Sequence, residues 1–159
     1  MKPGIYSGAA GTLFLIISAF SANAAELLVS DPWVRSAPPN APALGAFMLL
    51  ENKSDAEVSV VDAYSSLAVD RIELHRTMMD DGVMRMIPQQ SIPVPSHSST
   101  ELKPGSWHIM LIGPSKVPSM GETVELTLVF GNGTKQLVTA VVRQGKKMMD
   151  GHSHEMKSD

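Results

Sequence analysis

Alternating polar and apolar side chains are the feature that most restricts the fold of this chain. Residues 122–130 read Glu-Thr-Val-Glu-Leu-Thr-Leu-Val-Phe, with an apolar side chain at every second position from Val124 onward. A half-buried β-strand has this period of two. The Asn132-Gly133 pair that follows is a strong hairpin signal, and the Val-rich residues 135–143 are suited to be the partner strand. We therefore predict an antiparallel hairpin in this region.

The rest of the chain also has the character of short strands separated by turns. Pro-rich segments at residues 36–40 and 92–95 separate these strands and cannot themselves be central strands. We find no convincing helix of ordinary length and no internal repeat. The pattern predicts an all-β protein, an antiparallel β-sandwich or barrel. Further strands are expected at residues 46–50, 58–61, 71–75 and 107–111.

The N-terminus has the layout of a secretory signal peptide. Lys2 is followed by a short apolar core at residues 13–20, and then by small residues at Ala22 and Ala24. The alternative is an uncleaved membrane anchor, but spanning a bilayer takes about 20 apolar residues. We favour cleavage of residues 1–24 and export to the periplasm, without membrane insertion of the mature protein.

Composition limits what the exported chain can do. The 159 residues include no cysteine, so there are no disulfides and no thiolate ligands. The net charge of −3 does not suggest a nucleic-acid partner, which would call for a basic face. Residues 25–145 are long enough for one domain with its own core. Residues 146–159 offer little to bury, and we predict a disordered tail rich in Met and His.

Two histidines and two methionines form the most specific motif. His75 is followed after ten residues by Met86, and after twenty-one more by His108 and Met110. Zinc is normally held by Cys, His and carboxylates, and calcium and magnesium by oxygen, whereas thioethers select Cu(I). A single Met is more often a core gap-filler, and a single His is usually structural. The joint pattern predicts a Cu(I) site.

Hairpin geometry decides whether these donors can meet. If Asp81 and Gly82 form a two-residue loop, then Thr77 lies opposite Met86. Met86 then shares a face with His75, about 7–8 Å away at the backbone. A three-residue loop would place the two side chains on opposite faces. His108 and Met110 are two residues apart on a predicted strand, so both point the same way.

The motif and its surroundings resemble the periplasmic copper chaperones known as PCuAC. The resemblance covers about residues 27–143 and includes Asp31-Pro32-Trp33-Val34-Arg35-Ser36-Ala37-Pro38-Pro39, Glu73-Leu74-His75, Gly82-Val83-Met84-Arg85-Met86 and Leu102-Lys103-Pro104-Gly105. It implies a cupredoxin-like antiparallel β-sandwich or barrel with Greek-key character, and an accessible Cu(I) site. It also implies delivery of copper to the CuA site of cytochrome c oxidase subunit II. A thiol-based copper chaperone is a second candidate partner.

The tail and the predicted hairpin carry further donors. We predict a second metal site in the tail, where nitrogens could hold Cu(II) and sulfurs Cu(I). The alternative is a solvated tail with incidental histidines. Met78, Met79 and Met84 flank the main motif; we favour a hydrophobic rim, with spare sulfur donors as the other interpretation. We expect His97, in a polar turn, to be exposed. The tail donors are Met148, Met149, His152, His154 and Met156.

Other functions fit the sequence less well. A blue-copper electron carrier needs a Cys thiolate, which is lacking. A copper oxygenase that uses an N-terminal histidine does not fit a mature chain beginning at Ala25, and no hydrolase motif is present, so we predict that the protein is not an enzyme. Two alternatives stay open: a periplasmic copper-buffering or resistance protein without a dedicated acceptor, and a structural envelope domain that binds no copper.

Overall fold

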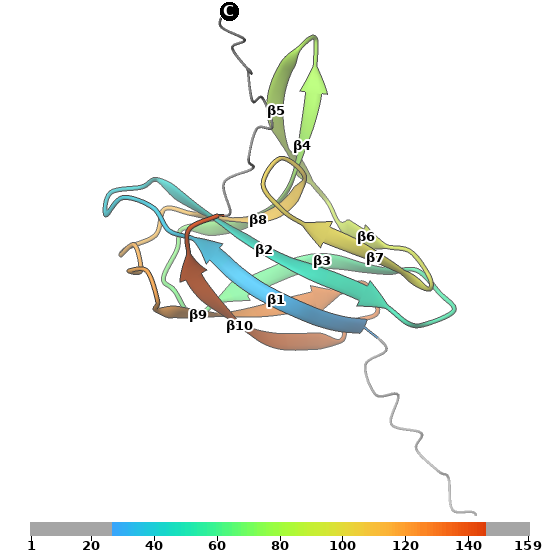
Figure 1. The fold of residues 1–159 in the computed structure, drawn as a ribbon. Helices are drawn as coiled ribbons and strands as arrows, with labels where there is room; N and C mark the ends of the chain where they lie inside the picture. The colour runs from blue at the N-terminus through green and yellow to red at the C-terminus, as the bar shows by residue number, and fades with distance from the viewer. Residues whose placement is uncertain (1–26, 146–159) are drawn as a thin grey trace, which may run out of the picture.

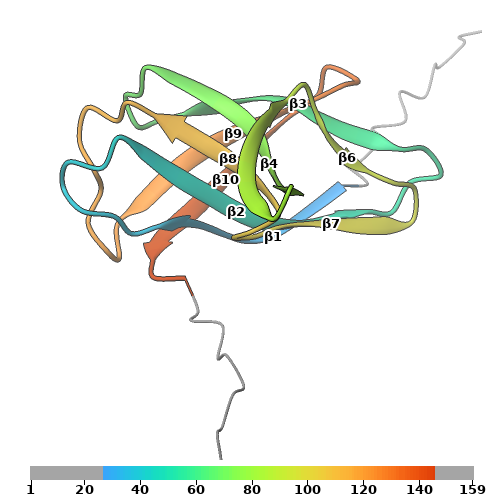
Figure 2. The same ribbon diagram turned by 90° about the horizontal axis from the view of Figure 1, so that it is seen from above.

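The fold is a single ten-stranded sheet that wraps into a two-layered sandwich (Figures 1 and 2). The computed structural model describes residues 27–145, and all regular structure in that range is β-strand. The order across the sheet is β5-β4-β8-β7-β2-β1-β10-β9-β3-β6. The strands are β1 Leu27–Arg35, β2 Ala43–Asn52, β3 Val58–Ser65, β4 Arg71–Asp80, β5 Val83–Gln89, β6 Ile92–Val94, β7 Ser98–Leu102, β8 Trp107–Ile112, β9 Thr123–Phe130 and β10 Lys135–Arg143.

The predicted all-β sandwich is therefore confirmed. The proposed signal peptide and the Met/His tail lie outside the described residues. Within residues 27–145 there is no helix long and apolar enough to cross a bilayer.

The core forms where the alternating strands turn their apolar faces inward. On β9, Val124, Leu126, Leu128 and Phe130 are all buried, as the period of two predicts. Burying one such side chain stabilises the fold by about 1.5–3 kcal/mol. The largest fully buried side chains of the other strands are Val34, Leu44, Met48, Leu50, Val60, Ile92, Val94, Leu102, Ile109 and Leu111.

Two of the prolines lie in the edge strands of the sheet. Pro93 lies in β6 and Pro88 in β5, and these two strands form the ends of the sheet order. A proline cannot donate to the ladder, so an edge strand accommodates it. The prediction that the segment at residues 92–95 is not a central strand is confirmed.

Strand β1 was not predicted from the sequence. It contains Pro32, and the register with β2 shifts between Ser30 and Trp33, where Asp31 has a positive φ of 49°. This irregularity lets a proline lie within a paired strand. β1 then continues in parallel with β10 through the pairs from Trp33 to Arg35. Most other pairings are antiparallel, as expected, with a second parallel contact between β7 and β8.

The β4–β5 hairpin projects from the sandwich (Figure 1). Asp80 lies opposite Val83, so the loop consists of Asp81 and Gly82, with φ values of 48° and 78°. Two successive positive φ angles are the requirement of a type I′ turn, which matches the twist of the flanking strands. The two-residue loop predicted from the sequence is confirmed, and with it the pairing of Thr77 with Met86.

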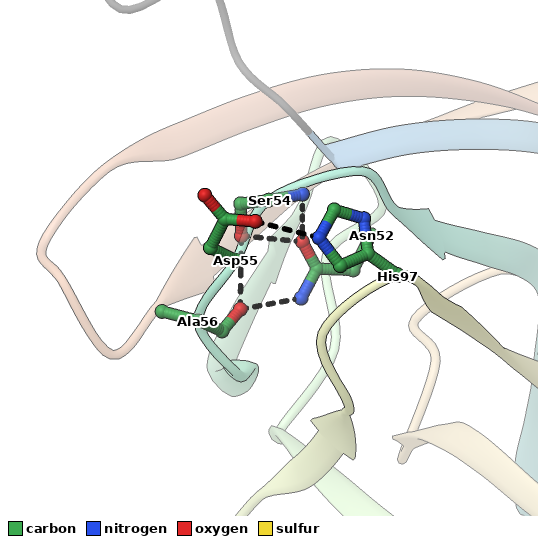
Figure 3. A network of polar contacts seen from close by, with 5 residues as sticks. All are labelled: Asn52, Ser54, Asp55, Ala56 and His97. Atoms are coloured by element: carbon green, nitrogen blue, oxygen red, sulfur yellow. Dashed lines mark hydrogen bonds and ion pairs between the residues drawn. The ribbon is translucent and has the colours of Figure 1, made fainter.

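A buried asparagine holds one end of the sandwich together (Figure 3). The amide of Asn52 donates to the carbonyl oxygens of Ala56 and Val94, at 2.8 and 3.0 Å. Its oxygen accepts from both the backbone nitrogen and the hydroxyl of Ser54. His97 is exposed, as expected, and its ring contacts Asp55 at 2.7 Å. The network ties the β2–β3 turn to the segment between β6 and β7.

Candidate metal centre

Two buried histidines lie side by side on β4 and β8, the second and third strands of the sheet order. His75 on β4 lies directly opposite His108 on β8, and their ring centroids are 5.6 Å apart in an edge-on arrangement. Only 8% of His75 and 3% of His108 is exposed. The two residues are 33 positions apart in the chain, and the antiparallel pairing of β4 with β8 brings them together.

Each histidine uses one ring nitrogen in a fixed hydrogen bond. Nδ1 of His108 lies 3.0 Å from the carbonyl oxygen of Ser106, and Nε2 of His75 lies 2.7 Å from a carboxylate oxygen of Glu73. Both partners are acceptors, so these ring nitrogens carry the protons. The remaining nitrogens, Nδ1 of His75 and Nε2 of His108, then have free lone pairs.

Those two free nitrogens are buried without a hydrogen-bond partner among the described residues. Leaving a buried polar atom unpaired costs about 1–3 kcal/mol. Histidines that bind metals have this arrangement, with one nitrogen anchored by a carboxylate or carbonyl and the other directed to the ion. The pair is therefore preorganised to offer two nitrogen donors.

Met110 lies beside the histidine pair. It is opposite Glu73 on β4 and opposite Gly45 on β2, and its side chain is half-buried. A β-carbon at Gly45 would come within 2.9 Å of Cζ of Phe47, so the ring of Phe47 occupies that space. Phe47 in turn packs 4.6 Å from Trp33 and 6.2 Å from His108, measured between ring centroids.

Met86 occupies a different setting from the other three predicted donors. It lies opposite Thr77 on the projecting hairpin, and 61% of it is exposed. The register places it on the same face as His75, as a diagonal neighbour about 7–8 Å away at the backbone. The structure thus brings His75, His108 and Met110 together on the packed sheet and holds Met86 above them on an exposed arm.

Burial favours the neutral form of His108, and hydrogen bonds favour the charged form of Glu73. Burial lowers the pKa of His108, and the nearby His75 lowers it further, while the hydrogen bond to the Ser106 carbonyl opposes both effects. Hydrogen bonds from Arg71 and His75 lower the pKa of Glu73. Metal binding requires the unprotonated imidazole, and this environment favours that form.

The described residues contain no cluster of hard donors, and the cavity nearest to the site is lined by other side chains. Within residues 27–145, no three His, Cys, Asp or Glu side chains form a group that could hold a metal ion. A cavity of about 610 Å³ opens between Trp33, Leu49, Met84 and Pro104. None of the four predicted donors lines it, although Trp33 joins it to the site through Phe47.

Three residues around the site were missed from the sequence: Glu73, Ser106 and Phe47. Glu73 could have been found, because a residue two positions before His75 on a strand shares its face. Ser106 acts through its backbone carbonyl and left no signal in the sequence. The predicted tail donors at residues 148–156 lie outside the described residues.

The all-β sandwich with a pair of opposed histidines defines a PCuAC-type domain with a cupredoxin-like fold. The "Copper-bound PCuAC domain from PmoF2" is 22% identical, with a TM-score of 0.64, covering 76% of this chain and 94% of that one. "CuI-DR1885" from Deinococcus radiodurans is 30% identical, with a TM-score of 0.57, covering 80% and 87%. The family model described as "Putative lipoprotein LpqE-like" matches residues 27–142, and the chain belongs to this family.

Two further proteins are similar to this chain in sequence. "Putative lipoprotein Lxx21020" of Leifsonia xyli subsp. xyli is 33% identical over 116 residues, which cover 72% of this chain and 68% of the relative. "Uncharacterized protein RP573" of Rickettsia prowazekii is 32% identical over 92 residues, and the match spans 49% of its length. The resemblance to PCuAC proteins that the motif predicted is confirmed.

Proposed function

We propose that this protein is a periplasmic copper chaperone that binds one Cu(I) ion through His75, Met86, His108 and Met110. The observation that carries the proposal is the pair of buried ring nitrogens that have no hydrogen-bond partner within residues 27–145, with thioethers on the same face. Two neutral imidazoles and two thioethers form a soft, uncharged donor set, which suits Cu(I). The names of the copper-bound PmoF2 domain and of Cu(I)-bound DR1885 support the choice of metal.

The four donors would have different tasks. His75 and His108 are fixed by Glu73 and Ser106, so they need little reorganisation when the cargo ion arrives. Met110 adds a sulfur from the packed sheet. Met86 is on the exposed arm, and its long side chain can approach or leave the ion without disturbing the core. A ligand of this kind favours both retention and release, as a carrier requires.

The acceptor that we propose is the CuA site of cytochrome c oxidase subunit II. The support is the PCuAC resemblance of residues 27–143, which includes all four donors. A thiol-based copper chaperone is a second partner, as donor or as reductant. We propose binding and transfer, not catalysis. The tail donors from Met148 to Met156 would capture copper and pass it to the main site as Cu(I). Cu(II) held in the tail would first accept one electron from a thiol of that partner.

An anaerobic Cu(I) competition titration tests the site. It compares the mature protein, the same protein ending at Gly145, and a variant in which all four donors are replaced. We expect one tightly bound ion in the truncated protein and its loss in the fourfold variant. His97→Ala is the matched control, because that exposed histidine lies at another end of the sandwich and should change nothing. Absence of tight binding in the truncated protein would contradict the proposal.

A second experiment separates the chaperone from a copper buffer. Both functions share the site but differ in whether an acceptor depends on it. Deletion of the gene should lower the copper content of the oxidase under copper limitation, and the wild-type gene should restore it where the fourfold variant does not. Normal oxidase copper in the deletion strain would favour the buffering or resistance function.

A further inference from the structure

The β4–β5 hairpin presents three methionines on the face that carries His75. Met79 lies directly opposite Met84, and the next pair on the same face is Thr77 with Met86. The pair after that is His75 with Pro88. Residues two apart on a strand share a face, so Met79, Met84 and Met86 form a row that leads from the hairpin tip to His75. We call these three residues the thioether row.

The spacing of the row suits transfer of an ion between neighbouring donors. Directly opposed residues have β-carbons about 4.5–5.5 Å apart, so Met79 and Met84 can both reach one ion. Two residues along a strand span about 7 Å, which separates Met84 from Met86. Methionine has three rotatable side-chain bonds and can cover part of that distance.

Charge is excluded from this face of the hairpin tip. Asp80 pairs with Arg85 at 3.1 Å, and the register places both on the opposite face, together with Met78. Within residues 77–86, the thioether row therefore shares its face only with Thr77. On the hairpin this face offers soft sulfur donors, which bind Cu(I) and discriminate against hard cations; charged side chains, Glu101 and Lys103 among them, meet Met84 only across the neighbouring cavity.

The three side chains of the thioether row are exposed, unlike those of a methionine cluster in a protein core. Met79, Met84 and Met86 are 68%, 60% and 61% exposed, although methionine is usually a residue of the interior. Met84 also extends over the β7–β8 turn: its methyl carbon would lie 3.8 Å from a β-carbon added at Gly105. The row is thus accessible to solvent along its length and reaches the sheet at His75.

We propose that Met79 and Met84 form a second, weaker Cu(I) site, and that copper passes between this site and the histidine pair through Met86. The inference rests on the proposed Cu(I) function and extends it to entry and exit. Each step is a ligand exchange in which the lone pair of one sulfur or ring nitrogen replaces that of another, so the copper remains Cu(I). The proposed second site replaces the interpretation of Met79 and Met84 as a hydrophobic rim.

Methyl NMR of the full-length mature protein tests binding. The methionine ε-methyl groups are labelled with ¹³C, assigned individually, and titrated with Ag⁺ as a redox-stable substitute for Cu(I). We expect Met86 and Met110 to shift first, followed by Met79 and Met84 together. Met78, on the other face of the hairpin, and Met120, which is 65% exposed elsewhere, are internal controls and should not move.

The titration distinguishes the second site at Met79 and Met84 from the main site. Shifts of Met86 and Met110 without shifts of Met79 and Met84 would overturn the second site and leave the proposed function intact. Absence of shifts at Met86 and Met110 would overturn the proposed function itself.

A kinetic experiment tests transfer. In the Met79→Leu/Met84→Leu double variant, which keeps the apolar volume, Cu(I) affinity at the main site should be unchanged. The rate of Cu(I) transfer to a chromophoric chelator should fall about tenfold. Met78→Leu on the same hairpin is the matched control and should transfer at the wild-type rate. An unchanged rate in the double variant would overturn the transfer route, and a large loss of main-site affinity would show that these residues are not a separate site.

Discussion

His75 and His108 lie opposite each other on β4 and β8, and each has one anchored and one unpartnered ring nitrogen within the described residues. The anchors differ in kind, because Glu73 supplies a charged carboxylate and Ser106 a backbone carbonyl. Only the first can be removed by substitution. Mutation can therefore test the anchor of His75 but not the anchor of His108.

Replacing Glu73 by Gln should weaken Cu(I) binding about 10–100-fold, the usual effect of losing a partner that orients a metal-binding histidine. The amide keeps the shape but loses the charge that fixes the proton on Nε2 of His75. A competition titration measures the change. Glu57→Gln, at an exposed position away from the site, is the control and should bind like the wild type. Equal affinities in both variants would show that Glu73 does not support the site.

Lowering the pH should destabilise the metal-free protein. Burial depresses the pKa of His108 below its ordinary value of about 6.5, so the unfolded chain binds more protons than the folded protein between the two pKa values. Stability is therefore full above pH ~6.5 and decreases as the pH falls through the depressed pKa. Urea unfolding of the wild type and of His108→Asn measures this contribution, which the variant should lack.

Cu(I) affinity should follow the same protonation. Protons compete with copper for the imidazole nitrogens, while the thioethers do not titrate in this range. We expect affinity to fall as the pH drops below ~6.5, with His108 resisting protonation because its pKa is depressed. An affinity that is flat between roughly pH 5 and 8 would contradict the assignment of the histidines as ligands.

Gly45→Ala should disturb the packing of Phe47 against His108. The new β-carbon would lie 2.9 Å from Cζ of Phe47, and the ring has Trp33 and His108 as neighbours. We expect a loss of about 1–3 kcal/mol in the free energy of unfolding, with weaker Cu(I) binding. Gly131→Ala, where the closest approach is 3.6 Å, is the control for a glycine with ordinary space. Chemical denaturation and titration of both variants check the expectation.

Asn52→Ala should lower stability without affecting copper. The side chain is 1% exposed and bonds the backbone at Ala56 and Val94. Its removal takes the side-chain donor from the buried Val94 carbonyl, at a cost of about 1–3 kcal/mol, whereas the Ala56 carbonyl keeps its bond from the Ser54 hydroxyl. Asp55→Asn, at an exposed ion pair, should change stability by less than about 1 kcal/mol. A stable Asn52→Ala protein would show that the network in Figure 3 is dispensable.

Local sequence signals predicted the hairpins and strand faces well. Asp81-Gly82 fixed the loop length and therefore the pairing of Thr77 with Met86, and the alternation in β9 identified its buried residues. β1 escaped prediction because Pro32 and the irregularity at Asp31 conceal a paired strand.

How the site residues come together could not be predicted from the sequence. That β4 pairs with β8 depends on how the whole sheet closes, and no local pattern encodes it. The spacing identified the histidines as a set, but the free nitrogen on each ring follows from partners on the strand and in the β7–β8 turn. Such contacts require the folded coordinates.

The Asp81-Gly82 loop controls more than the shape of one turn. Side chains on a strand alternate between faces, so a one-residue slip of β5 against β4 would move Met84 and Met86 to the side that now carries Arg85, and a residue inserted while the loop kept its two-residue turn would cause such a slip. The sandwich would survive such an insertion, because the hairpin projects from it. Every donor would still be encoded in the gene, yet the sulfurs of β5 would face away from His75. The proposed copper handling therefore depends on the strand register that this turn sets, and a comparison of related sequences by motif alone would not detect its loss.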